Sequence, residues 1–253
     1  MADKIRLIAR LEVKNDYLVK GIQLEGLRKL GDPHDFAKEY YEAGIDEILY
    51  LDIVASLYNR NNLSHILRRT TEDIFIPITV GGGLRTLEDV HAVLAQGADK
   101  VAINTAAIKN PELITQVAQA YGSQCMVLSI QAKRRRDAEG WEAYYDNGRE
   151  HSGLDVVTWA RRGVALGAGE ILLTSVDREG LGRGMEDGLI RQVADAVPVP
   201  VIAAGGAGSA GDIAAAAKAG AAAVALSSLL HYRRMSVGEL KQALIGQGVE
   251  VRR

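Results

Sequence analysis

The chain contains the same pattern twice, about 123 residues apart. The segment 44–49 (GIDEIL) reappears at 167–172 (GAGEIL), and 97–102 (GADKVA) reappears at 220–225 (GAAAVA), both at a shift of 123. The turn 80–83 (VGGG) has a partner at 204–207 (AGGA) at nearly the same shift. A shift repeated in this way indicates a duplicated structural unit. We expect two halves, approximately 1–121 and 122–253, within one domain covering 1–253, and we expect a site in one half to recur in the other.

Short runs of β-branched and aliphatic residues alternate with amphipathic stretches of helix length along the whole chain. Such alternation predicts parallel strands joined by helices. Helices are predicted, for example, at 35–43 and 87–96, and a series of eight strands closes most readily into a barrel. The predicted fold is therefore an α/β (βα)8 TIM barrel made of two (βα)4 halves, and 253 residues suit one such domain. The eight predicted strands are 5–13, 47–53, 76–80, 100–103, 125–130, 170–176, 199–203 and 222–226.

Composition excludes several classes of function. Thirty basic against thirty-two acidic residues give a formal charge of −2, so no overall field attracts the chain to nucleic acid or to a membrane. The single cysteine, Cys125, excludes an intramolecular disulfide and a multi-thiolate zinc site, and the five histidines have no metal-ligand spacing. We predict no metal and no cofactor. With no signal-peptide pattern at 1–10 and no apolar run of about 20 residues, we expect a cytoplasmic protein.

Two glycine-rich turns follow predicted strands, at 81–83 and 205–208. Glycines leave backbone N–H groups uncovered where an anion can approach, although tight turns require glycine in any case. Each turn is followed, at the end of the next predicted strand, by small polar residues, Asn104-Thr105 in one half and Ser227-Ser228 in the other. Two such sites related by a two-fold axis predict a ligand that carries a phosphate at each end.

Eight stretches together resemble one known family over essentially the whole chain: 20–21, 31–33, 51–53, 80–83, 103–107, 122–124, 173–178 and 205–208. The chain is similar to the cyclase subunit family of imidazole glycerol phosphate synthase, HisF. The resemblance implies a barrel that accepts ammonia through its lumen from a glutaminase partner of the HisH type. It also implies that this ammonia converts a bisphosphorylated ribulosyl aminoimidazole carboxamide nucleotide into imidazole glycerol phosphate and a purine intermediate.

The resemblance assigns roles to particular residues. Lys20 matches a catalytic position. A ring of four charges at the amino-terminal ends of the strands gates ammonia entry in the family, with a salt-bridge plug as the structural alternative, and Asp99 resembles a residue that meets the glutaminase. The ring matches Arg6, Glu47, Lys100 and Glu170. Substrate and phosphate binding matches Asp52, Gly82, Gly83, Asn104, Thr105, Thr174, Asp177, Gly180, Gly205, Gly206, Ser227 and Ser228.

The chain departs from the family where the chemistry is done. The family uses two aspartates, at the ends of the first and fifth strands, as general acid and base, and these positions fall on Glu12 and Gln131. Gln131 cannot exchange a proton at neutral pH. Positioned acid–base catalysis typically contributes about 10²–10⁴-fold, so we expect cyclisation to be badly impaired. Arg10 is expected to point into the barrel beside Glu12 and to leave a poorer base, unless the two groups merely satisfy each other.

Two further features lie at the same end of the predicted barrel. Glu179 stands where the family commonly has aspartate, which puts the second phosphate loop in question. The basic run 133–136 follows the fifth predicted strand and either reaches over a ligand or is a solvated loop.

Three hypotheses follow for the function. The first is an ammonia-accepting subunit, impaired in cyclisation, that works outside histidine synthesis, for which relatives that install an amidino group on a sugar offer a precedent. The second is an active synthase subunit in histidine biosynthesis in which Glu12 suffices. The third is a binding or scaffold barrel without chemistry.

Overall fold

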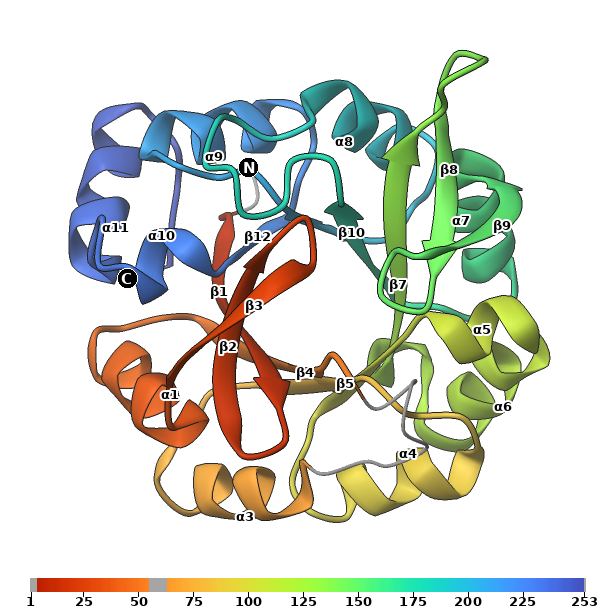
Figure 1. Ribbon diagram of the computed structural model, residues 1–253, viewed down its shortest axis with the longest axis horizontal. Coiled ribbons are helices and arrows are strands. Elements are labelled where there is room, and N and C mark those ends of the chain that lie inside the picture. The colour runs from red at the N-terminus through yellow and green to blue at the C-terminus, as the bar shows by residue number, and fades with distance from the viewer. Residues whose placement is uncertain (1–3, 55–62, 253) are drawn as a thin grey trace.

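The computed structural model describes residues 4–54 and 63–252. Eight parallel strands close into a ring in the order β1, β4, β5, β6, β7, β10, β11, β12 and back to β1 (Figure 1). The predicted (βα)8 barrel is therefore confirmed, and each predicted strand coincides with a barrel strand. These strands are β1 (Arg6–Lys14), β4 (Glu47–Asp52), β5 (Ile78–Gly81), β6 (Lys100–Ile103), β7 (Met126–Arg134), β10 (Glu170–Ser175), β11 (Val201–Ala204) and β12 (Ala223–Leu226).

Helices surround the ring and cover its outer surface (Figure 1). Several begin at a side chain that accepts the free N–H groups of the first turn, as Thr86 and Ser236 do in reciprocal capping boxes. The helices are α1 (Pro33–Glu42), α3 (Ser64–Asp73), α4 (Leu87–Leu94), α5 (Thr105–Lys109), α6 (Glu112–Tyr121), the 3₁₀ helix η1 (Ser123–Cys125), α7 (Val156–Ala165), α8 (Asp187–Ala194), α9 (Ala210–Lys218), α10 (Ser228–His231) and α11 (Val237–Gly246).

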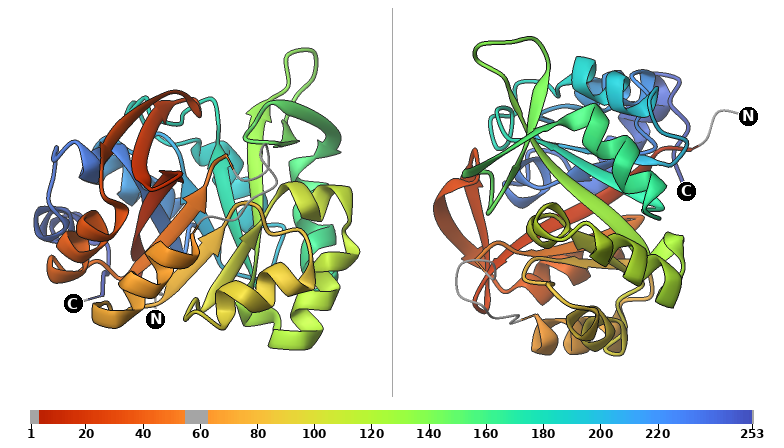
Figure 2. Two further views of the ribbon diagram at one scale, coloured as in Figure 1. Left: turned by 60° about the horizontal axis from the view of Figure 1, so that its bottom comes forward. Right: turned by 90° about the vertical axis from the view of Figure 1, so that its right-hand side faces the viewer.

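Two antiparallel hairpins, absent from the prediction, follow the first strand of each half. β2 (Tyr17–Ile22) pairs with β1 and with β3 (Glu25–Gly31), while β8 (Trp141–Tyr145) pairs with β7 and with β9 (Glu150–Asp155). The duplication thus includes the hairpins. Figure 2 shows hairpin β2–β3 on the opposite side of the barrel from the amino terminus, so the hairpin lies over the carboxyl-end face.

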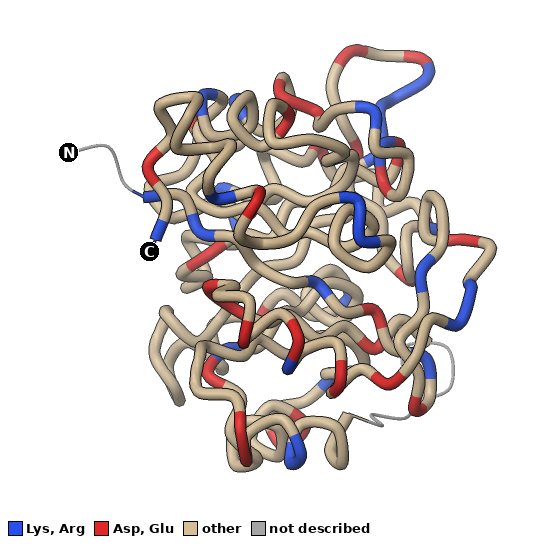
Figure 3. Tube along the Cα trace, turned by 90° about the vertical axis from the view of Figure 1, so that its left-hand side faces the viewer, with Lys and Arg blue, Asp and Glu red and all other residues tan. Residues whose placement is uncertain are grey.

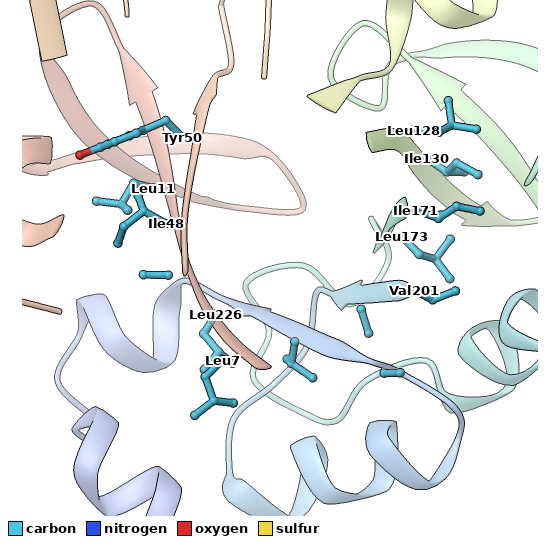
Figure 4. Packing of buried hydrophobic residues seen from close by; sticks show 14 of the residues in the cluster. Leu7, Leu11, Ile48, Tyr50, Leu128, Ile130, Ile171, Leu173, Val201 and Leu226 are labelled. Carbon is cyan, nitrogen blue, oxygen red and sulfur yellow. The ribbon is translucent and has the colours of Figure 1, made fainter. Parts of the chain in front are cut away.

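Buried apolar residues form two layers, one on each side of the strands. The outer layer packs the strands against the helices, and Figure 4 shows Leu128 and Ile130 of β7 beside Ile171 and Leu173 of β10, their register partners. The inner layer fills the lumen with smaller side chains. It consists of Ile8, Leu49, Ala102, Val127, Leu172, Ile202, Ala204, Ala223 and Ala225. Alternate residues of each strand face inward, so the strands are buried on both sides.

Acidic and basic residues are interspersed along the trace (Figure 3). None of the helices among residues 4–54 and 63–252 is long and apolar enough to cross a membrane.

Candidate functional site

A closed ring of ion pairs lies at the amino-terminal ends of the strands. The Arg6 guanidinium donates to Glu47 (2.6 Å) and to Glu170, and the Lys100 ammonium reaches Glu170 (2.9 Å) and Glu47 (3.4 Å). Each cation bridges both carboxylates, and burial of the two carboxylates is nearly complete. All four residues predicted for the ring are therefore brought together at the floor of the lumen.

Arg10 lies above the apolar lumen and begins a second charged layer. Its side chain bonds to Glu12 (2.7 Å), Glu179 (3.3 Å) and the Thr174 hydroxyl (3.4 Å). Lys20, from hairpin β2–β3, bonds to Glu12 (3.0 Å) and to Glu179. Two cations and two carboxylates thus form a closed, solvent-excluded cluster, with every member at most 3% exposed. The expectation that Arg10 and Glu12 pair is confirmed, with Lys20 and Glu179 as additional partners.

The charges of this cluster are fixed by one another. Burial alone would raise the pKa of Glu179, but Lys20 and Arg10 lower it to about 2, and the two carboxylates outweigh burial to raise the pKa of Lys20. Behind the cluster, burial and the Lys20 charge lower the pKa of His231 to about 4. His231 is therefore neutral at pH 7: Tyr40 donates to its Nδ1 (2.7 Å) and its Nε2 donates to the Arg10 carbonyl (3.0 Å).

The first glycine turn opens onto a cavity of about 330 Å³ at the carboxyl ends of the strands. A Cβ on Gly82 would lie 2.0 Å from the Asp52 carbonyl oxygen, so backbone packing by itself requires glycine there. Three basic side chains, those of Arg10, Arg85 and Lys109, also line this cavity. The predicted residues that line it are Asp52, Gly82, Gly83, Asn104, Thr105 and Gln131.

The second glycine turn bounds a much smaller cavity of about 20 Å³. The structure brings all five residues predicted for this half together there, and it adds Glu179. The five are Gly180, Gly205, Gly206, Ser227 and Ser228.

Some of the predicted polar side chains have partners within the protein. The Asn104 amide donates to the Ser129 and Tyr144 carbonyls (3.0 and 3.1 Å), and the Ser227 hydroxyl donates to the Arg10 carbonyl (3.0 Å). Thr105 accepts the Asp146 N–H (3.1 Å). Both halves therefore use Asn104, Thr105 and Ser227 to hold neighbouring segments.

Four residues predicted for catalysis or substrate binding lie apart from these two cavities, the first and the second cradle. Glu12, Lys20 and Thr174, each no more than 2% exposed, line neither cavity. Asp177 accepts the Arg134 N–H (2.8 Å) and lines a separate polar cavity of about 720 Å³ between the hairpins. The basic run 133–136 lines that cavity too, and it lines neither of the glycine-turn cavities.

Asp99 is exposed beside the charged ring, but its carboxylate also accepts the Ile78 N–H (2.7 Å) at the start of β5. The carboxylate of Asp46 does the same for Leu7 on β1 (2.7 Å). Asp99 therefore has a structural role besides the interface role that the resemblance implies. Among the residues described, no cluster of three or more potential metal ligands is found.

Comparison with known proteins agrees with this geometry. The family model for histidine biosynthesis proteins matches residues 6–236. The chain belongs to this family, and within it to the HisF proteins. It is 58% identical over 204 residues to an imidazole glycerol phosphate synthase subunit HisF of Legionella pneumophila, covering 81% of this chain and 96% of that protein. The HisF subunits of Mycobacteroides abscessus (46% identical, all of both chains) and Synechococcus sp. (49%, 98% of both chains) are also similar. All three relatives carry the name of the HisF subunit of imidazole glycerol phosphate synthase.

Proposed function

We propose that this chain is the cyclase-type subunit of an imidazole glycerol phosphate synthase, paired with a HisH-like glutaminase. The observation that carries the proposal is the arrangement along the barrel axis. A ring of four charges lies at one end of an apolar lumen, and two glycine cradles, one from each half, lie at the other. A ligand with a phosphate at each end spans the cradles, and ammonia enters through the ring.

The same site lacks the groups that make cyclisation fast. Glu12 is enclosed by Arg10 and Lys20 and lines neither cavity. Gln131 does line the first cavity, but an amide neither gives nor takes a proton at neutral pH. We therefore expect a subunit that binds its ligand well and turns it over slowly.

A second candidate function is supported by one contrast within the barrel. The ring is complete, whereas both acid–base positions are altered. This contrast favours an ammonia-accepting subunit that serves a pathway other than histidine synthesis, such as one that installs an amidino group on a sugar. A barrel that acts only as a scaffold does not need the ring for ammonia entry, although the same four charges could serve as a plug at the floor of the lumen.

Complementation of a histidine auxotroph that lacks its own cyclase tests the proposal. Growth supported by the unmodified chain together with its glutaminase identifies an active synthase subunit. Growth that requires Glu12→Asp together with Gln131→Asp identifies a HisF barrel whose acid–base pair has been lost, which favours the second candidate. Failure of both, with soluble protein present, contradicts the proposal.

A further inference from the structure

The two cradles differ in size in a way that the sequence repeat does not predict. The first cavity holds about 330 Å³ and the second about 20 Å³. A water molecule needs roughly 10–15 Å³ measured in this way, so the enclosed part of the second cradle has room for little more than one water. The glycines and serines expected there are all in place, and the lining includes one charged side chain, that of Glu179.

Glu179 lines the second cradle, and a Cβ on Gly205 would lie 3.3 Å from Glu179 Oε2. A carboxylate oxygen therefore already lies beside the Gly205 backbone, at the turn where a phosphate would bind. The carboxylate is held there from the side by Lys20 and Arg10.

Hairpin β2–β3 holds this arrangement shut. Lys20 belongs to strand β2 of the hairpin and contacts the Glu179 carboxylate. The turn that follows β2 is attached to the loop that carries Glu179, because the Gln23 N–H donates to the Glu179 carbonyl (2.9 Å). Packing is close, since a Cβ on Gly180 would lie 2.7 Å from the Gly21 carbonyl oxygen. The Lys20–Glu179 contact and the backbone contacts of the hairpin with residues 179–180 therefore support one another.

We propose that Glu179 is the internal occupant of the second cradle and decides what that cradle accepts: a phosphate enters only when hairpin β2–β3 withdraws Lys20 and the carboxylate is displaced. A phosphate and an ionised carboxylate cannot share a site from which water is excluded, because like charges repel strongly there. The first cradle is then the entry site, and the second phosphate binds later and more weakly. This inference rests on the proposed function in requiring a ligand with two phosphates.

The experiment measures binding of inorganic phosphate separately at each cradle. Backbone amide signals of Gly82 and Gly83 report on the first cradle, and those of Gly205 and Gly206 on the second, in NMR titrations of the full chain. In the unmodified protein we expect the second cradle to bind at least about tenfold more weakly, a difference of about 1.4 kcal/mol. Glu179→Gln should bring the two dissociation constants to within about threefold.

Glu12→Gln is the matched control. It removes one carboxylate charge from the same Arg10–Lys20 pair, but Glu12 does not line the second cradle. Phosphate affinity at the second cradle should change less than in Glu179→Gln. Glu179→Asp, which keeps the charge and shortens the side chain, covers the case in which Glu179→Gln fails to fold, and it should open the cradle in part.

The outcomes separate this inference from the proposed function. Equal affinity at both cradles in the unmodified chain overturns the inference, and so does an equal gain in Glu12→Gln and Glu179→Gln. Absence of phosphate at the first cradle contradicts the bisphosphorylated ligand, while a gain at the second cradle in Glu179→Gln would still uphold the role of Glu179.

Discussion

The Lys20 ammonium lies 3.0 Å from Glu12 Oε2, with both side chains 1% exposed. The contact joins hairpin β2–β3 to β1, the barrel strand that carries one of the positions proposed for acid–base catalysis. Glu12 is consequently one of four members of an ion-pair network and not an isolated base. Its carboxylate must give up partners before it can take a proton from a ligand.

Lys20→Met should destabilise the protein strongly. The substitution leaves Glu12 and Glu179 buried with Arg10 as their only cation in the cluster, and breaking a buried ion pair typically costs about 3–5 kcal/mol. Denaturant unfolding measures the loss. Arg233→Met is the matched control, because its pair with Glu39 is exposed and should contribute less than about 1 kcal/mol. Similar losses in the two variants would show that the cluster is not a stabilising unit.

Stability should fall as the pH drops from about 6.5 to 4 because of His231. The unfolded state protonates this group near 6.5, whereas burial and Lys20 keep the folded pKa at about 4. The unfolded state therefore binds more protons within this window, and up to about 3 kcal/mol is lost as the pH falls. Unfolding free energies at a series of pH values measure the slope.

His231→Gln should make the unfolding free energy less dependent on pH in this window, by the equivalent of about one proton bound on unfolding. Exposed His91, whose Nδ1 contacts the Tyr121 hydroxyl (3.0 Å) as that of His231 contacts Tyr40, provides the comparison. His91→Gln should leave the slope in place. If both substitutions change it equally, burial of His231 is not its cause.

The barrel was predictable because each of its strands carries its own apolar signal. β6 was predicted with the bounds that it has, Lys100–Ile103, and the other strands to within a few residues. Hairpin β2–β3 was missed because its turn uses Gln23 and Leu24, at φ of 51° and 65°, where asparagine or glycine is the usual signal. Asp146 and Asn147, between β8 and β9 of the other hairpin, do carry that signal, but this hairpin was missed as well.

The candidate site was predictable only as far as the repeat reached. Both cradles and the ring follow from local motifs and the family resemblance. The contact between Lys20 and Glu179 spans 159 residues and follows from no periodicity. The departure of Glu179 from the family aspartate was the one available signal, and it indicated a doubtful phosphate loop without indicating that a carboxylate fills it.

Cyclisation of the bisphosphorylated nucleotide with added ammonia should run below about a hundredth of the rate of an ordinary HisF subunit. This is the lower end of what positioned acid–base groups contribute. Glu12→Asp together with Gln131→Asp should recover part of the loss in a steady-state assay. Glu112→Asp with Gln116→Asn, the same kinds of change at exposed positions of helix α6, controls for unspecific effects. A normal rate in the unmodified chain would refute the argument from the missing aspartates.

The floor of the barrel should dock a glutaminase, and the charge of Asp99 should matter for it. Co-expression with a glutaminase encoded beside this chain should yield a stable heterodimer. Asp99→Arg should weaken it at least about tenfold, by charge conflict at the interface, as calorimetry or analytical ultracentrifugation can measure. The carboxylate also accepts the Ile78 N–H, so the variant loses a fold contact as well.

Asp99→Asn separates the two effects, because the amide keeps an acceptor oxygen for Ile78 and loses only the charge. If Asp99 acts through its charge, Asp99→Asn should weaken the heterodimer while the melting temperature of the isolated barrel stays near that of the unmodified chain. Weakening that appears only in Asp99→Arg, in proportion to lost stability, would assign Asp99 to the fold alone.

Lys100→Met tests the ring in the same complex: it leaves Glu47 and Glu170 sharing Arg6, so ammonia transfer should suffer more than docking. Glutamine-dependent turnover that falls while turnover with added ammonia persists is the expected sign of a gate, and equal loss of both would mark the ring as a structural plug.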